Sequence, residues 1–143
     1  MLPNFKLQMV RDESSEYEPV TLSGPEVVAE HMSHLKADFV ESMHICFVNV
    51  KNQIVGTQQI AQGGNSSCTI HPQEIFRGAL LTGAQGIIMV HNHPSGSTNP
   101  SAEDVNITKK AVEIGKLLEI QVLDHVIIAG DKHTSLRSLG YIK

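Results

Sequence analysis

The chain has 143 residues, of which 41% are hydrophobic and 18% are charged, and its formal net charge is −4. This length predicts one domain, large enough to bury about two-thirds of the surface that the unfolded chain exposes. The basic residues are scattered, with one adjacent pair at Lys109 and Lys110, and tryptophan is absent. A strong nucleic-acid-binding surface needs a basic stripe or stacking aromatic residues, so none is expected.

Cysteine content and hydrophobicity also limit the class of protein. Cys46 and Cys68 are too few to staple a small secreted scaffold. We expect Cys46 to pack as a small apolar side chain within a strand, and Cys68 to be structural, with a reactive thiol there as the alternative. No segment has the form of a signal peptide or of a membrane span, so a cytoplasmic protein without membrane contact is expected.

Hydrophobic periodicity predicts the elements of the first half of the chain. An edge strand is expected at residues 5–10, followed by a loose acidic stretch at 12–18, and we separate residues 1–19 from a domain at 20–143. Ser23 and Glu26 have capping-box spacing ahead of an apolar helical stripe. That stripe consists of Val27, Val28, His31, Met32 and Leu35. Residues 43–50 and 53–60 are expected to form a hairpin. The glycine-rich turn at residues 63–65 precedes no helix, which disfavours a phosphate-binding loop.

The second half alternates helices with apolar strands. Pro72 is expected to open a helix, because its missing N–H has no role at the first helical position. The predicted buried side of this helix is Ile75, Phe76, Ala79, Leu80 and Gly83. A buried strand is expected at Gly86–Val90, a helix from Ala102 to about Leu118, and a final strand at 121–129. The apolar stripe of that helix is Ile107, Ala111, Ile114 and Leu118. The alternation predicts an α/β domain with helices on both faces of a mixed sheet.

The candidate functional residues follow the strand at Gly86–Val90. If the extended conformation continues, His91 and His93 point to the same face. The turn-forming loop at 94–100 could bring Asp104, in the first turn of the next helix, back over the strand end. Two imidazoles and a carboxylate are the three protein ligands that a catalytic zinc takes, and the fourth position is left for water. Iron or manganese could occupy such a site as well.

Each part of this pattern has a simpler interpretation when it stands alone. A His-x-His pair at a strand end is commonly surface decoration. Ser101 and Asp104 have the spacing of a capping box, which is compatible with facing a site. His71 could cap a helix or lie near the pocket, and His125 could support the site or pair locally with its neighbour Asp124. We place neither histidine among the ligands.

The complete string is more specific than its parts. His91-x-His93-Pro94, with Ser101 and Asp104 at the spacing found here, resembles the JAMM (MPN+) metalloprotease motif. The variant His-Asn-His-Pro-Ser-Gly is most similar to the RadC-like branch of the JAB superfamily, and the likeness extends over about residues 20–143. Further segments that fit this branch are 52–54, 56–57, 71–76 and 123–125. Asn92 stands where eukaryotic members usually have serine or threonine, which favours the RadC-like branch over the deubiquitinases.

The resemblance implies a fold, a metal and a reaction. It implies a JAB/MPN-like, cytidine-deaminase-like domain with a mostly antiparallel sheet, in which His91, His93 and Asp104 bind zinc and Ser101 stabilises the transition state. The general acid/base of the family lies one residue ahead of a core strand, which here is Glu41. Glu26, Glu30 and Glu74 compete for that role, but Glu26 and Glu74 lie early in predicted helices, where acids suit the helix dipole. The implied activity is hydrolysis of a peptide or isopeptide amide.

Two other functions remain as alternatives. The RadC name has been associated with DNA repair, which predicts salt-sensitive DNA binding, and the acidic balance of the chain argues against it. Full-length RadC proteins usually begin with a helix-hairpin-helix region, for which the residues ahead of the first helix are too few. The second alternative is a non-catalytic MPN-type scaffold; such members usually lack one or more of the metal residues, all of which are present here. An exposed hairpin edge could also support a homodimer.

Overall fold

One six-stranded sheet organises the chain, and the computed structural model describes residues 1–12, 17–63 and 70–143. The strands lie in the order β1-β3-β2-β4-β5-β6, and all neighbouring pairs are antiparallel except β4 and β5. Their bounds are β1 Val20–Thr21, β2 Ser42–Val48, β3 Gln53–Gln62, β4 Gly86–Asn92, β5 Gln121–Ala129 and β6 Lys132–Ser135. The structure therefore confirms the predicted mixed and mostly antiparallel sheet.

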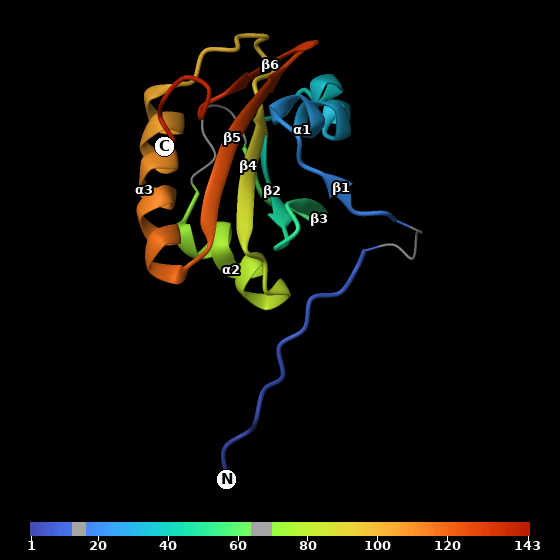
Figure 1. Ribbon diagram of the computed structural model, residues 1–143, viewed down its shortest axis with the longest axis vertical. Coiled ribbons are helices and arrows are strands. Elements are labelled where there is room, and N and C mark those ends of the chain that lie inside the picture. Colours follow the sequence, from blue (N-terminus) through green and yellow to red (C-terminus); the bar gives the residue numbers. More distant parts are fainter. Residues whose placement is uncertain (13–16, 64–69) are drawn as a thin grey trace.

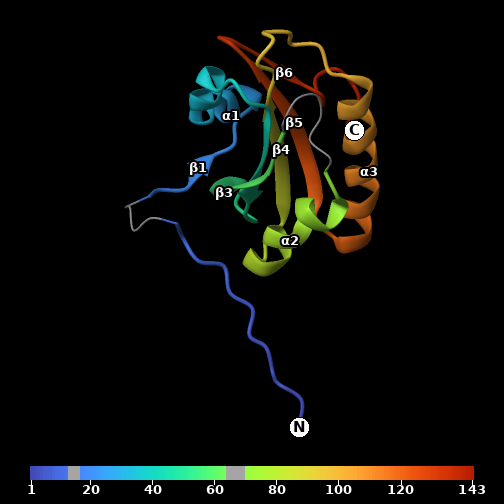
Figure 2. The ribbon, with the colours of Figure 1, turned by 180° about the vertical axis from the view of Figure 1, so that it is seen from behind.

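Helices cover both faces of this sheet, as predicted (Figures 1 and 2). The short helix α1 (Pro25–His31) and the 3₁₀ helix η1 (Ser33–Ala37) pack on one face, and α2 (Pro72–Thr82) and α3 (Ala102–Leu118) pack on the other. Alternate residues of β2 serve the two cores, because successive strand side chains point to opposite faces. Ile45 and Phe47 pack toward α2 and α3, whereas Cys46 and Val48 pack toward α1.

The connection between β4 and α3 brings the candidate site together. The carboxyl end of β4 and the amino end of α3 lie at the same end of the molecule (Figure 1). Ser101 caps α3: its Oγ accepts from the Asp104 N–H at 3.0 Å, and the Asp104 carboxylate accepts from the Ser101 N–H at 2.8 Å. Such reciprocal capping fixes the first helical turn and removes two unsatisfied donors.

Two predictions for the first forty residues are wrong. Residues 5–10 form no strand; Met9 is partly buried against the core, and the chain before it runs out from the domain (Figure 1). The edge strand is β1, which pairs with Gln53 and Ile54 of β3. An alternating sequence becomes a strand only when a partner accepts its hydrogen bonds, and β1 already occupies this sheet edge. Helix α1 begins at Pro25 after Gly24, without a side-chain cap from Ser23, because proline suits the first helical position.

The buried faces of the longer helices also differ from prediction in places. Leu80 is 58% exposed and Leu118 is 40% exposed, although both were placed in apolar stripes. In α2 the buried residues are Ile75, Phe76, Gly78 and Ala79, and Leu80 lies outside that sector at 100° per residue. In α3 the buried stripe is Asp104, Thr108, Ala111 and Gly115. Of the predicted apolar stripe, Ile107, Ala111 and Ile114 do lie in or against the core. Two of the four buried positions are polar, however, and an apolar pattern does not reveal them.

The remaining points concern the short strand β6 and the segments outside the described residues. The polar strand β6 follows the turn at Gly130 and pairs with β5, so the strand at 121–129 is not the last one. The acidic stretch, the turn at residues 63–65 and Cys68 lie wholly or partly outside the described residues. Among the helices that the structure describes, none is long and apolar enough to cross a membrane.

Candidate metal centre

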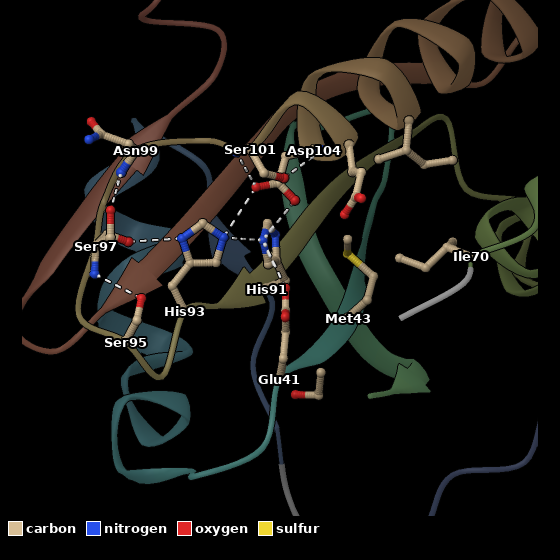
Figure 3. A pocket seen from close by; sticks show the side chains of 13 residues that line it. Glu41, Met43, Ile70, His91, His93, Ser95, Ser97, Asn99, Ser101 and Asp104 are labelled. Atoms are coloured by element: carbon tan, nitrogen blue, oxygen red, sulfur yellow. Dashed lines mark hydrogen bonds and ion pairs between the residues drawn. The ribbon is translucent and has the colours of Figure 1, made fainter. Parts of the chain in front are cut away.

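Four side chains from three separate segments converge at the end of β4 (Figure 3). His91 lies in β4, His93 follows it, Asp104 lies in the first turn of α3, and Glu41 directly precedes β2. Because β2 runs antiparallel to β4 with Met43 opposite His91, Glu41 arrives at the same sheet end as the histidines. The potential ligand atoms of the four residues all lie within 4.8 Å of one another. The structure thus brings together the predicted ligands and the predicted acid/base.

The spacing of these atoms suits a small cation. His91 Nε2 lies 2.9 Å from His93 Nε2 and 3.1 Å from Asp104 Oδ1, and His93 Nε2 lies 3.1 Å from Asp104 Oδ2. Ligands about 2.0–2.1 Å from a tetrahedral zinc lie about 3.3 Å apart. Glu41 Oε1 lies 3.5 Å from His91 Nε2. The Glu41 carboxylate therefore lies next to the three more closely spaced residues, His91, His93 and Asp104.

The orientation of His93 further supports a cation at this point. Its Nδ1 lies 2.8 Å from the Ser97 carbonyl oxygen, and a carbonyl can only accept, so Nδ1 carries a proton. In the neutral ring the Nε2 lone pair then faces His91 and the Asp104 carboxylate. A metal ion or a second proton satisfies this arrangement. The hydrogen bond to Asp104 accordingly raises the pKa of His93.

Asp104 is held in the ionised form that a metal ligand requires. Burial alone would raise its pKa, but the contacts of the carboxylate with the His91 and His93 rings outweigh burial and lower the pKa overall. The Ser101 N–H donates to the same carboxylate, and the amino end of α3 adds a favourable dipole.

Asn92 fixes the backbone on both sides of Glu41. Its side chain is buried, and its Oδ1 accepts from the Ser42 N–H at 2.8 Å while its Nδ2 donates to the Val40 carbonyl at 3.0 Å. The amide thereby continues the β2–β4 pairing beyond the last backbone pair, Met43 and His91. Sequence reasoning treated Asn92 as a mark of the family branch and missed this contact.

His125 lies directly behind His91, so its side chain supports the candidate site and does not pair with the neighbouring Asp124. It is fully buried, and its Nε2 lies 2.7 Å from His91 Nδ1. The neighbouring Asp124 carboxylate instead accepts from the His125 N–H, the Ser135 hydroxyl and the Arg137 N–H, which anchors the segment after β5. Burial lowers the pKa of His125.

Thr108 completes the set of residues behind the site, and sequence reasoning missed it. Its hydroxyl lies 2.6 Å from His125 Nδ1 and 2.6 Å from the Asp104 carbonyl oxygen. Its position four residues after Asp104 was the available signal, since such residues share a helix face. The exposed His71 precedes α2 without a side-chain cap and does not line the pocket beside the metal residues.

The converging residues open onto a pocket of about 290 Å³ (Figure 3). Its polar side is formed by the loop between β4 and α3, with Ser101 at its end. The other side is apolar and consists of Met43, Ile70 and Ile107. The pocket therefore offers a polar wall and an apolar wall beside the candidate metal position.

Comparisons with known proteins identify the family. The RadC-like JAB domain matches residues 22–141. A UPF0758 protein of Listeria monocytogenes serovar 1/2a is 42% identical over 128 residues, covering 89% of this chain and 57% of the relative. One of Caldanaerobacter subterraneus is 40% identical over 132 residues, covering 90% and 55%. One of Methanosarcina mazei is 43% identical over 97 residues, covering 68% and 42%.

The chain spans about half the length of these relatives, and their names state no activity. The family match covers nearly all of the fold and every residue of the candidate metal centre. The chain therefore belongs to the RadC-like JAB domain family.

Proposed function

We propose that this chain is a zinc-dependent hydrolase of the metallopeptidase or isopeptidase type. The observation that carries the proposal is the convergence of His91, His93 and Asp104 with Glu41 on one pocket. Two imidazole nitrogens and one carboxylate form the donor set of a catalytic zinc site, and a separate carboxylate is then available for proton transfer.

The metal and Glu41 have separate roles in this mechanism. A zinc ion held by His91, His93 and Asp104 would lower the pKa of a water molecule in its open position from about 16 toward 7. Glu41 would accept a proton from the water molecule that attacks the amide carbonyl, and would then deliver that proton to the leaving nitrogen. Its carboxylate oxygen, 3.5 Å from His91 Nε2, lies at the edge of the donor set, as such a shuttle requires.

Ser101 supplies the hydrogen-bond donor of the mechanism. Its Oγ accepts from the Asp104 N–H, which uses a lone pair and leaves the hydroxyl proton free to be donated. Ser101 lines the pocket beside the metal residues, so we assign its O–H to the developing oxyanion. One such donor typically lowers the barrier by about 3 kcal/mol.

Metal analysis of the purified protein tests the site first. We expect about one zinc per chain in the wild type and in Glu41→Gln, and loss of zinc in His91→Ala and Asp104→Ala. The exposed His133 provides a matched control, because His133→Ala removes an imidazole outside the site. A wild-type protein that takes up no zinc would support the scaffold interpretation instead.

Activity is tested on a library of peptide and isopeptide substrates. Glu41→Gln should keep its zinc and lose cleavage by at least about 10²-fold, the typical effect of removing a general acid/base. Glu113→Gln, an exposed change of the same chemistry on α3, should cleave at the wild-type rate. Full activity of zinc-loaded Glu41→Gln on a confirmed substrate would refute the mechanism. Salt-sensitive DNA binding that is unaffected by His91→Ala would support the DNA-repair alternative.

A further inference from the structure

A chain of short hydrogen bonds lies behind the metal centre, and its direction can be deduced from one backbone carbonyl. The contacts run from His91 Nδ1 to His125 Nε2 at 2.7 Å, from His125 Nδ1 to Thr108 Oγ1 at 2.6 Å, and from Thr108 Oγ1 to the Asp104 carbonyl oxygen at 2.6 Å. It therefore begins at one candidate ligand and ends on the backbone of another, crossing β4, β5 and α3.

The last contact fixes the Thr108 hydroxyl. A carbonyl oxygen has no proton to donate, so at 2.6 Å the single hydroxyl proton of Thr108 must lie toward the Asp104 carbonyl. With the proton turned away, two oxygen atoms would meet at 2.6 Å without a hydrogen between them. Thr108 Oγ1 can then only accept from His125, so His125 Nδ1 carries a proton.

The tautomer of His125 in turn determines that of His91. His125 is fully buried, and its ring nitrogens contact a hydroxyl and another imidazole, neither of which compensates a positive charge. A neutral ring is therefore favoured. Because its proton is on Nδ1, Nε2 is an acceptor, and His91 Nδ1 must donate to it. In a neutral His91 ring, Nε2 is then unprotonated, and its lone pair faces His93 Nε2 at 2.9 Å and the Asp104 carboxylate at 3.1 Å, an arrangement that a cation between them would satisfy.

We propose that Thr108 and His125 are positioning residues that hold His91 in the tautomer whose Nε2 can bind a metal ion. Neither residue contacts the metal position itself. Three hydrogen bonds in series join the Asp104 carbonyl oxygen to the His91 ring, so the acceptor at one end determines which nitrogen of His91 carries the proton. Outer hydrogen bonds of this kind fix ligand tautomers and typically change metal affinity by about 10–100-fold. The proposal rests on the proposed metal function for its consequence, although the tautomer is a property of the metal-free protein.

Substitution of Thr108 should reverse the direction of the hydrogen bonds between His125 and His91. In Thr108→Val the hydroxyl acceptor is lost while the size of this fully buried side chain is kept. His125 can then satisfy its ring by moving the proton to Nε2 and donating to His91 Nδ1, which forces the His91 proton onto Nε2. Zinc binding must then remove the proton from His91 Nε2, so the affinity for zinc should fall by about 10–100-fold. Thr108→Ser keeps the hydroxyl and should restore both the tautomer and the affinity.

The decisive measurement is the pair of ring ¹⁵N chemical shifts of His91 in metal-free protein, followed across pH so that the spectra themselves identify the neutral ring. We expect a protonated Nδ1 in the wild type and in Thr108→Ser, and a protonated Nε2 in Thr108→Val. A wild-type spectrum with the proton on His91 Nε2 overturns the proposal. The wild type alone therefore tests it, even if Thr108→Val does not fold.

Zinc affinity, measured by competition with a chelating dye, separates the remaining outcomes. Weakened binding in Thr108→Val with an unchanged His91 tautomer means that Thr108 acts through packing alone, and overturns the proposal. Unchanged affinity also overturns it. If the wild type binds no zinc but the tautomer switches between Thr108→Val and Thr108→Ser as expected, the hydrogen-bond chain stands and the proposed metal function fails.

Discussion

Asn92→Ala is expected to destabilise the domain strongly although it removes no metal ligand and little apolar surface. The Asn92 side chain is buried and hydrogen-bonds the backbone on either side of Glu41. The Ser42 N–H is buried, and leaving it without a partner costs about 1–3 kcal/mol. Val40 is 39% exposed and its bond to Asn92 is only partly buried, so we add at most about 1 kcal/mol for the loss of this bond. The free energy of unfolding should therefore fall by about 2–4 kcal/mol.

Urea denaturation followed by circular dichroism measures this change. Asn106, exposed on α3, provides the control, because Asn106→Ala should alter the free energy of unfolding by less than about 0.5 kcal/mol. Asn92→Asp keeps one acceptor but turns a carboxylate oxygen toward the Val40 carbonyl, so it should also be destabilised. In zinc-loaded Asn92→Ala we expect the metal to remain while cleavage slows, since the segment carrying Glu41 loses its anchor. A stability of Asn92→Ala within about 0.5 kcal/mol of the wild type would refute the reasoning.

Three further predictions concern packing, thiol reactivity and metal linkage. Gly115→Ala should lower the free energy of unfolding by about 1–3 kcal/mol, because the new Cβ would clash with the backbone carbonyl oxygen of Ile120; an unchanged urea midpoint would contradict this. Burial raises the pKa of Cys46 to about 12, so its thiol should react slowly with maleimide in the native protein at mildly alkaline pH. A Cys68→Ser background isolates this thiol. Rapid labelling of Cys46 without unfolding would contradict the prediction. Zinc at 100 times its dissociation constant should raise the free energy of unfolding of the wild type by about 2.7 kcal/mol. Thermal unfolding with and without a chelator measures this change. An equal response in His91→Ala would show that the zinc binds somewhere other than the proposed site.

The structure corrects the sequence most clearly on helix α3. Its bounds, Ala102–Leu118, agree with the prediction, because a serine cap and an acidic first turn mark the start of a helix locally. The apolar pattern correctly places Ile107, Ala111 and Ile114 in or against the core, but it does not reveal that the polar Asp104 and Thr108 occupy two of the four buried positions. Hydrophobic periodicity cannot reveal a buried polar residue whose partner, here His125, lies on another element. For the same reason Thr108 escaped the predicted site.

Local chemistry in the sequence determined the alternation of elements, the His-x-His pair at a strand end and the cap that holds Asp104 in the first turn of α3. Those signals act over a few residues, since strand alternation and helix capping depend on near neighbours. Only the tertiary structure decided that Glu41 meets His91, because the antiparallel pairing of β2 with β4 sets that register. The same holds for Asn92 beside Glu41, whose hydrogen bonds join residues about fifty positions apart. Such contacts depend on how separate strands pack, which no local pattern specifies.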